Sequence, residues 1–277
     1  MKLIGGFQAN KIGDLKLDVV PRAGVIWSPA SRFGVKALYS EAFRAPSLNE
    51  TLLDYVPPPS IGGPSLLGNP NLLPEKVATV DLALNYQGSR FQAEIGYFHS
   101  KLTNDIILAN ATTRGVYENL GQVAFHGVEL EGKYYLRKSF FLTASALYQA
   151  NEDGDGNRNV TPIANYGAKG GASYESANGV TLSAFDIYEG PLPSSYSAAA
   201  LNPRPGAYNL LNGHLRFDLA KLLHSAAWRG LALVAHGENL ANTAVWLPDW
   251  KDVPGDSIFA NRGRTVYLGI EFALKKD

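Results

Sequence analysis

Two glutamates stand two positions apart, at Glu129 and Glu131, and carboxyl groups at that spacing could act as a paired acid and base. Apolar residues alternate with them, and Lys133 continues the polar series. Side chains two positions apart on an extended strand share one face, so the same residues also make a ladder of charges. The sequence contains no nucleophile elbow, phosphate-binding glycine loop or helical zinc pair. We therefore interpret the glutamates as a charge ladder in a hydrated interior, and we expect no enzyme.

Candidate metal ligands are scattered along the chain. There is no cysteine, which excludes thiolate metal sites, disulfides and cysteine nucleophiles. The segment 151–157 is rich in Asp, Asn and Gly, but an EF-hand counted from Asp153 would need glycine at 158 and glutamate at 164, where Arg158 and Ala164 stand. We expect no resident metal and no cofactor, with an irregular calcium site in that loop as the alternative. The histidines fall in different predicted strands or turns, without the spacing of a metal-ligand motif, at His99, His126, His214, His224 and His236.

Aromatic and basic residues in the long connections are better candidates for binding a ligand. Rings on loops can stack on a bound molecule or cover it. Packing of one loop against another explains the same aromatic residues, which include Phe259. Arg44 ends a predicted strand, where an ion pair at the rim is favoured over direct contact with a ligand. The candidate ligand-binding residues are Arg44, Tyr55, Trp246, Trp250 and Arg262.

The elements that must position these residues are predicted to be strands, because apolar and polar residues alternate with period two. In the segment 79–87, Val80, Leu82, Leu84 and Tyr86 share one face and Asp81 lies on the other. Many such segments have ten or more residues, which is longer than the usual globular strand of about five or six and suits the roughly nine to eleven that cross a bilayer. Twelve are expected, near 2–9, 16–27, 34–44, 78–87, 90–100, 124–136, 140–150, 164–174, 180–189, 208–219, 231–240 and 264–274.

The connections alternate between short and long, which is typical of an outer-membrane barrel with periplasmic turns and extracellular loops. The stretch 10–15 should be long on this scheme and is short. The short turns are expected at 28–33, 88–89, 137–139, 175–179 and 220–230, and the long loops at 45–77, 101–123, 151–163, 190–207 and 241–263. Aromatic residues near the strand ends suit the two interfacial girdles of such a barrel, although tyrosine also favours strands in general: Trp27, Phe33, Tyr97, Tyr134, Tyr148, Tyr174, Tyr188 and Tyr208.

Composition narrows the class of protein further. The 277 residues carry 25 basic and 25 acidic side chains, a balance that speaks against nucleic-acid binding. Only 18% of residues are charged, yet no stretch approaches the roughly 18 apolar residues of a membrane helix. These features leave a transmembrane β-barrel or a soluble β-protein rich in Gly and Tyr. The first residues contain no apolar run long enough for a secretion signal, so we expect either a non-exported protein or a piece of a longer one.

Several segments together resemble the C-terminal barrel portion of TonB-dependent outer-membrane receptors. They occur in the expected order and span most of residues 20–274. Asn-Pro and Leu-Pro steps within them favour extended or turn geometry, which stops and restarts strands around a loop. The segments are 42–50 (AFRAPSLNE), 68–76 (GNPNLLPEK), 119–121 with 127–131 (NLG and GVELE), 238–242 (ENLAN) and 263–269 (GRTVYLG).

The resemblance implies an all-β, antiparallel transmembrane barrel over residues 1–277, in which about twelve strands form part of a barrel of about twenty-two. Members of the family also have an N-terminal plug domain and an energy-coupling box, which we do not find here. Tyr267, Gly269, Phe272 and Leu274 resemble the signal in the last strand that the barrel assembly machinery captures by strand addition. The chain is therefore expected to be a portion of a receptor. A self-contained twelve-stranded pore or barrel enzyme is the alternative.

The family implies uptake of a scarce nutrient, often a ferric siderophore, across the bacterial outer membrane. The expected partners are outer-membrane lipid, the barrel assembly machinery, a small extracellular ligand and a TonB-type energy transducer acting through a plug. Haem receptors carry a ligating histidine between the two proline-containing segments, whereas residues 47–68 contain no histidine and offer only Tyr55. Haem is therefore the less favoured ligand.

Overall fold

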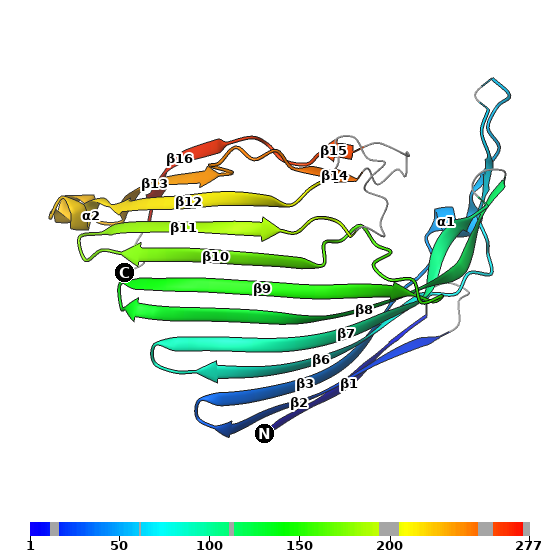
Figure 1. The fold of residues 1–277 in the computed structure, drawn as a ribbon, viewed down its shortest axis with the longest axis horizontal. Helices are drawn as coiled ribbons and strands as arrows, with labels where there is room; N and C mark the ends of the chain where they lie inside the picture. Colours follow the sequence, from blue (N-terminus) through cyan, green and yellow to red (C-terminus); the bar gives the residue numbers. More distant parts are fainter. Residues whose placement is uncertain (12–16, 61, 111–113, 194–204, 249–256, 274–277) are drawn as a thin grey trace. The chain divides into compact units, whose positions relative to one another are not determined.

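The computed structural model describes residues 1–11, 17–60, 62–110, 114–193, 205–248 and 257–273. Antiparallel strands make up nearly all of this part of the chain, which confirms the predicted all-β class (Figure 1). Twelve strands follow one another in the hydrogen-bonded order β1-β2-β3-β6-β7-β8-β9-β10-β11-β12-β13-β16. In this order β1 and β16 each have a single neighbour, so the described residues do not close a barrel.

Most strand bounds lie close to those expected from the alternation. Strands β1–β2, β2–β3 and each consecutive pair from β9 to β16 along this path are antiparallel. The twelve strands are β1 Lys2–Asn10, β2 Asp18–Ala30, β3 Phe33–Arg44, β6 Glu75–Gln87, β7 Phe91–Ala109, β8 Arg114–Arg137, β9 Phe140–Asp153, β10 Tyr166–Glu175, β11 Val180–Glu189, β12 Tyr208–Asp218, β13 Leu231–Glu238 and β16 Thr265–Phe272.

Short elements occupy three of the connections. Between β3 and β6 lie the helix α1 (Leu48–Leu52) and the strands β4 (Asp54–Tyr55) and β5 (Ser65–Leu67), and β5 also pairs in parallel with β8. Between β12 and β13 lie α2 (Leu219–Leu222) and the 3₁₀ turn η2 (Ala226–Trp228). Between β13 and β16 the strands β14 (Trp246–Pro248) and β15 (Ser257–Phe259) pair antiparallel. Among the residues that the structure describes, no helix has the length and apolar character needed to cross a membrane.

One predicted loop is largely strand. Residues 101–123 were expected as a long connection, but β7 continues to Ala109 and β8 begins at Arg114. The added length contains polar residues such as Thr103, Asn104 and Asp105 in place of an apolar series. A hairpin that extends beyond a bilayer needs no apolar face. Its strands therefore lack the alternation of apolar and polar residues on which the prediction relied. The unexpectedly short connection at 10–15 lies mostly outside the described residues.

The chain divides into two compact units. The first comprises residues 1–84, 96–127 and 150–160, and the second comprises 85–95, 128–149 and 161–277. In the first unit, Lys76 of β6 pairs with Asp18 of β2, with 2.7 Å between Nζ and Oδ1. Buried apolar side chains are few among its described residues, and they include Val20, Leu72 and Ile106.

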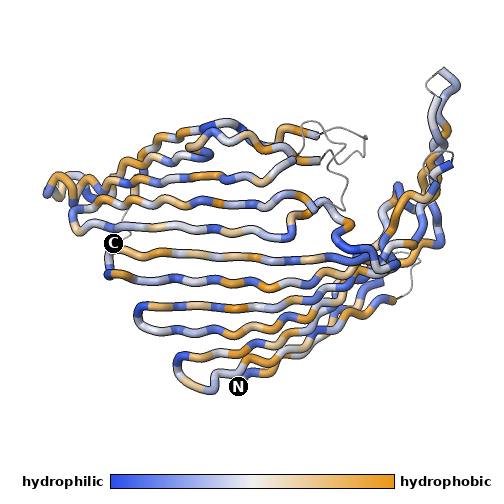
Figure 2. Tube along the Cα trace, in the orientation of Figure 1, coloured by the Kyte–Doolittle hydropathy of each residue, from blue (hydrophilic) through white to orange (hydrophobic). Residues whose placement is uncertain are grey.

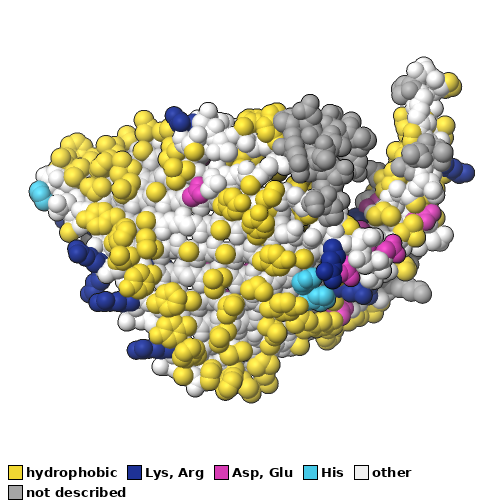
Figure 3. Space-filling view, viewed as in Figure 1, with side chains coloured by type: hydrophobic (Ala, Val, Ile, Leu, Met, Phe, Trp, Pro, Cys, Tyr) yellow, Lys and Arg dark blue, Asp and Glu magenta, His cyan; other side chains and the backbone are white. Residues whose placement is uncertain are grey.

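In the second unit the strand register separates an apolar face from a polar face. Leu182 lies opposite Leu215, which lies opposite Ala235, whereas on the other face Ser183 lies opposite His214. The apolar side chains are exposed, and Leu268 is 81% accessible. Figure 2 shows the alternation along the strands, and Figure 3 shows hydrophobic side chains gathered over them. The apolar face is therefore exposed in the described structure, as expected of a surface that contacts lipid.

Two aromatic rows flank this apolar face. Tyr166 and Tyr188 stack with ring centroids 6.2 Å apart, and Tyr174 lies opposite Phe140 near the other end of β10. Tyr166 and Tyr174 are eight residues apart, which is about 27 Å along a strand and about 20 Å across a membrane at the usual barrel tilt. That spacing fits the apolar band of an outer-membrane barrel. Tyr208 is the exception among the predicted girdle residues, because it lies opposite Glu189 on the polar face.

Candidate functional site

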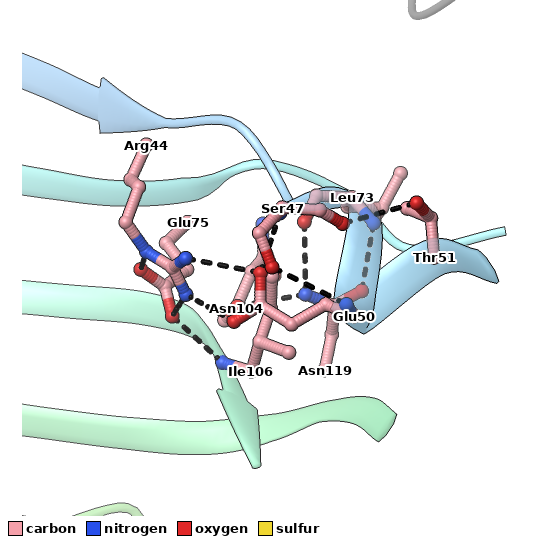
Figure 4. Close-up of polar contacts among 9 residues, drawn as sticks. All are labelled: Arg44, Ser47, Glu50, Thr51, Leu73, Glu75, Asn104, Ile106 and Asn119. Carbon is pink, nitrogen blue, oxygen red and sulfur yellow. Dashed lines mark hydrogen bonds and ion pairs between the residues drawn. The ribbon is translucent and has the colours of Figure 1, made fainter. Parts of the chain in front are cut away.

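A network of one arginine and two glutamates lies at the end of β3, in the first unit (Figure 4). The guanidinium of Arg44 donates to Glu50 through Nη1 and Nη2, at 3.0 and 2.9 Å. It also donates to Glu75, through Nε and through Nη2 at 2.7 Å in the latter case. A guanidinium that binds two carboxylates through paired contacts is held in a fixed plane. The predicted ion pair of Arg44 is confirmed, and its side chain remains 48% exposed.

The local sequence explains why Glu50 reaches Arg44. Pro46 follows the end of β3, and Ser47 then caps the N-terminus of α1. The Ser47 hydroxyl accepts from the Glu50 amide at 3.2 Å, and the Glu50 carboxylate accepts from the Ser47 amide at 2.6 Å. This reciprocal capping box fixes the first turn of the helix. The same carboxylate that caps α1 therefore also binds Arg44.

Glu75 joins this network to β7. It is the first residue of β6, its side chain is 11% exposed, and its Oε1 accepts from the backbone amide of Ile106 at 2.9 Å. Glu50 lies in α1 and Glu75 begins β6, so both carboxylates lie at the loop end of the long strands. The hydrogen bonds from Arg44 lower the pKa of Glu75 and of Glu50. Burial, and then the neighbouring Glu75, raise the pKa of the Asp105 carboxyl.

Two asparagines attach the end of the loop to β7 and β8. Asn119 of β8 accepts from the Leu73 amide at 2.7 Å and donates to the Leu73 carbonyl at 2.9 Å, and it also donates to the carbonyl of Asn104 at 2.7 Å. Asn69 donates to the Tyr117 carbonyl at 3.1 Å. Side-chain amides can replace a neighbouring strand in this way because they carry both a donor and an acceptor. These contacts fix the loop where it returns to the sheet.

Glycines allow the three family-like segments to meet. A Cβ at Gly68 would lie 2.5 Å from backbone atoms of Thr51 and Leu52 in α1, and a Cβ at Gly121 would lie 2.5 Å from the Asp105 side chain. The Asn69 amide also donates to the Glu50 carbonyl at 2.8 Å. The segments 42–50, 68–76 and 119–121 therefore form one structural unit, which we call the rim latch. Each of the three segments could be recognised in the sequence, but their contact with one another could not be predicted from it.

The rim latch is expected to weaken in acid. Because the folded pKa values of Glu50 and Glu75 are lowered, these groups stabilise the latch above the unfolded pKa of about 4.3, and the contribution is lost as the pH falls through the lower folded values. The protection of the Ile106 and Asn69 amides, taken relative to their intrinsic exchange rates at each pH and compared with strand amides, should therefore fall as the pH drops below about 4. An Arg44→Met variant serves as control, because it should lose this extra acid sensitivity. Protection that falls steadily from pH 7 would contradict the expectation.

The other predicted ligand-binding residues fall into two sets. Tyr55 lies on β4 in the first unit, like Arg44, and is 43% exposed. Trp246 and Arg262 lie in the second unit, where Trp246 packs edge to face on Phe259 at 5.3 Å and the Arg262 side chain is exposed. Trp250 lies outside the described residues. Ligand contact by these residues stays a prediction.

Sequence reasoning singled out the segment 238–242 for its resemblance, but not its role in holding the β14–β15 connection. Asn239 is buried, takes a positive φ of 48°, and donates to the Thr243 carbonyl while accepting from the Thr243 amide, both at 2.8 Å. Arg264 donates through Nε to the Leu240 carbonyl at 2.7 Å. A Cβ at Gly237 would lie 2.6 Å from the Leu240 side chain, so glycine makes room for that leucine. The segment 238–242 is thus a structural clamp, and asparagine, which tolerates positive φ, was its visible signal.

The predicted assembly signal lies on β16. Phe272 is 66% exposed on the apolar face, where Ile270 lies opposite Leu233, and Tyr267 lies opposite His236 on the polar face. Gly269 shares the face of Tyr267, and Leu274 lies outside the described residues. Recognition of this strand by the assembly machinery stays a prediction.

Comparison with known proteins gives relatives and structures of receptor or transport type. The chain is 30% identical over 157 residues to an iron-regulated outer membrane virulence protein of Vibrio cholerae, covering 52% of this chain and 24% of that protein. It is 26% identical over 145 residues to heme/hemopexin utilization protein C of Haemophilus influenzae, covering 44% and 20%. The matched region thus spans between a fifth and a quarter of the length of the curated relatives.

Solved structures give the same fold. The ferric enterobactin receptor PfeA of Pseudomonas aeruginosa superposes with a TM-score of 0.74 at 14% identity, over 98% of this chain and 42% of that one. The siderophore receptor PirA of the same organism gives 0.68 at 16% identity with the same coverage. The family model for the TonB dependent receptor-like β-barrel matches residues 7–240, which is most of the sequence. This chain therefore belongs to the TonB-dependent receptor-like β-barrel family.

Proposed function

We propose that this chain forms part of the wall and rim of an outer-membrane receptor that takes up a scarce nutrient, such as a ferric siderophore. The observation that carries the proposal is the separation of faces in the strands, with an exposed apolar face and a polar face that bears paired charges such as Arg216 and Glu271, 2.8 Å apart. A wall of this kind separates lipid from a hydrated interior. The task requires no covalent chemistry, and the protein is not an enzyme.

The rim latch serves capture of the ligand by holding the loop that carries Tyr55. A loop whose ends are fixed loses less conformational entropy when a ligand binds than a free loop does. The Arg44 side chain is 48% exposed, while two carboxylates orient its guanidinium. In the second unit, the clamp at Asn239 holds the connection that carries Trp246. Aromatic rings held in this way offer surfaces on which a flat ligand can stack.

Transport by such a receptor depends on partners other than this chain. A plug and a TonB-type energy transducer would drive release of the ligand, outer-membrane lipid surrounds the apolar face, and the barrel assembly machinery inserts the strands. A self-contained twelve-stranded pore is less well supported, because it requires β1 to pair with β16, and the hydrogen-bonded order does not contain that pair.

The proposal is tested by ligand quenching of tryptophan fluorescence in the chain folded in detergent. A panel of ferric siderophores should quench the fluorescence at saturable concentrations, and Trp246→Phe with Arg262→Ala should reduce the affinity by tenfold or more, since an interface hot spot is worth about 2 kcal/mol. Trp228→Phe is the matched control, because it removes the same side chain from the short connection between β12 and β13, away from the β14–β15 connection. Equal loss in both variants, or no saturable quenching with any member of the panel, would contradict the proposal.

A further inference from the structure

Two histidines that are far apart in the sequence are direct neighbours on the polar face of the second unit. His214 of β12 lies opposite His236 of β13 in the strand register, and the centroids of their rings are 6.1 Å apart. Residues directly opposite each other on antiparallel strands have Cβ atoms about 5 Å apart, so both rings project from nearly the same place. We propose that His214 and His236 form a two-imidazole site for a borderline divalent transition metal ion such as Cu²⁺, Ni²⁺ or Zn²⁺.

The separation of the rings suits one shared ion. A metal bound to an imidazole nitrogen at about 2.0–2.1 Å lies about 3.2 Å from the centre of that ring. Two imidazoles on either side of one ion therefore have centres up to about 6.4 Å apart, and the pair in this protein is 6.1 Å apart. Side-chain rotations alone can then direct one nitrogen from each ring to the ion, while the strand register stays unchanged. Both side chains are only partly buried, so an ion and its water ligands have access.

Neighbouring groups orient His236 and balance the charge. The Glu238 carboxylate lies 3.6 Å from Nε2 of His236, so a negative charge stands beside the ring and attracts a cation bound there. The nearest strong cation on β12, Arg216, is paired with Glu271 at 2.8 Å. On the other side of His236, the Tyr267 ring stacks on it, with ring centroids 6.3 Å apart.

The chemistry of the pair selects the class of ion. Imidazole ligands favour copper, nickel and zinc over magnesium or calcium, and affinity rises toward Cu²⁺ in the divalent series. Within the described residues, no group of three or more His, Cys, Asp or Glu is arranged to hold a metal ion. The proposed site therefore has two protein ligands, and water completes the coordination. This inference depends on the strand register and is independent of the proposed nutrient.

The test is binding of Cu²⁺ to the full chain folded in detergent. Equilibrium dialysis measures the number of bound ions, and electron paramagnetic resonance identifies their ligands. The double variant H214N/H236N should bind one equivalent fewer than the unmodified chain and lose the nitrogen hyperfine pattern of two imidazoles. Glu238→Gln should keep the equivalent but bind it about tenfold more weakly. His224→Asn is the control, because this histidine lies in the turn after α2, and the variant should behave as the unmodified chain.

A second measurement needs no variant. Carbethoxylation of His214 and His236 in the unmodified chain, located by mass spectrometry, should be slowed at least fivefold by Cu²⁺ or Zn²⁺, whereas that of His224 should not change. Magnesium should give no protection, since it prefers oxygen ligands. Unchanged modification of His214 and His236 in the presence of copper, or a full complement of bound copper in the double variant, would overturn the proposal.

Discussion

Replacing Leu82 with arginine is expected to destabilise the membrane-inserted sheet by about 2–4 kcal/mol. Leu82 lies near the middle of β6, and its side chain is 47% exposed, as is that of Leu84 on the same face. In lipid vesicles this side chain would contact hydrocarbon, where a guanidinium loses its water. Unfolding by urea in vesicles, followed by tryptophan fluorescence, measures the change.

Asp81→Arg is the matched control for this prediction. It introduces the same side chain one position earlier on the same strand, but on the face that alternates with the apolar one. Its expected cost is below about 1 kcal/mol, because a polar interior stays hydrated. Equal costs for the two variants would show that the assignment of faces is wrong, and with it the membrane-facing interpretation of the whole sheet.

The extent of the strands could be predicted because alternation is a local property. A series such as Val80, Leu82 and Leu84 shows its face without knowledge of any partner strand. The prediction failed for residues 101–123, since strands outside the bilayer have water on both sides and no reason to alternate. The aromatic residues near strand ends could be predicted from the same local alternation. Tyr208 differs, because it lies opposite Glu189 on the polar face.

Contacts between distant segments could not be read from the sequence. Arg44 and Glu75 are 31 residues apart. His214 and His236 lie on two strands whose pairing register cannot be read from the connection between them. A shift of one residue in that pairing would send one histidine to the opposite face. Spacing along the chain therefore suggested isolated histidines, whereas the register makes them neighbours. The rim latch was similarly hidden, because its three segments are each unremarkable turns or strand ends.

Glu75→Gln is expected to loosen the rim latch by about 1–3 kcal/mol, while the sheet beyond it stays folded. The neutral amide keeps the size of the side chain but loses the charged contact with Arg44, and one of its two positions is a donor that faces the guanidinium. The Ile106 amide then competes for the one remaining acceptor oxygen.

Hydrogen exchange at the Ile106, Asn69 and Leu73 amides measures this loosening, and cleavage of the loop 53–67 by a protease gives a second readout. Glu152→Gln is the control, because its ion pair with Arg158 is longer, at 3.4 Å, and both side chains are well exposed. An exposed pair of this kind contributes at most about 1 kcal/mol and often nothing. If the two variants change the exchange of these amides equally, Glu75 does not hold the latch. If Glu75→Gln alone raises both exchange and cleavage, the contacts of the Glu75 carboxylate with Arg44 and with the Ile106 amide are what fix the loop at the rim.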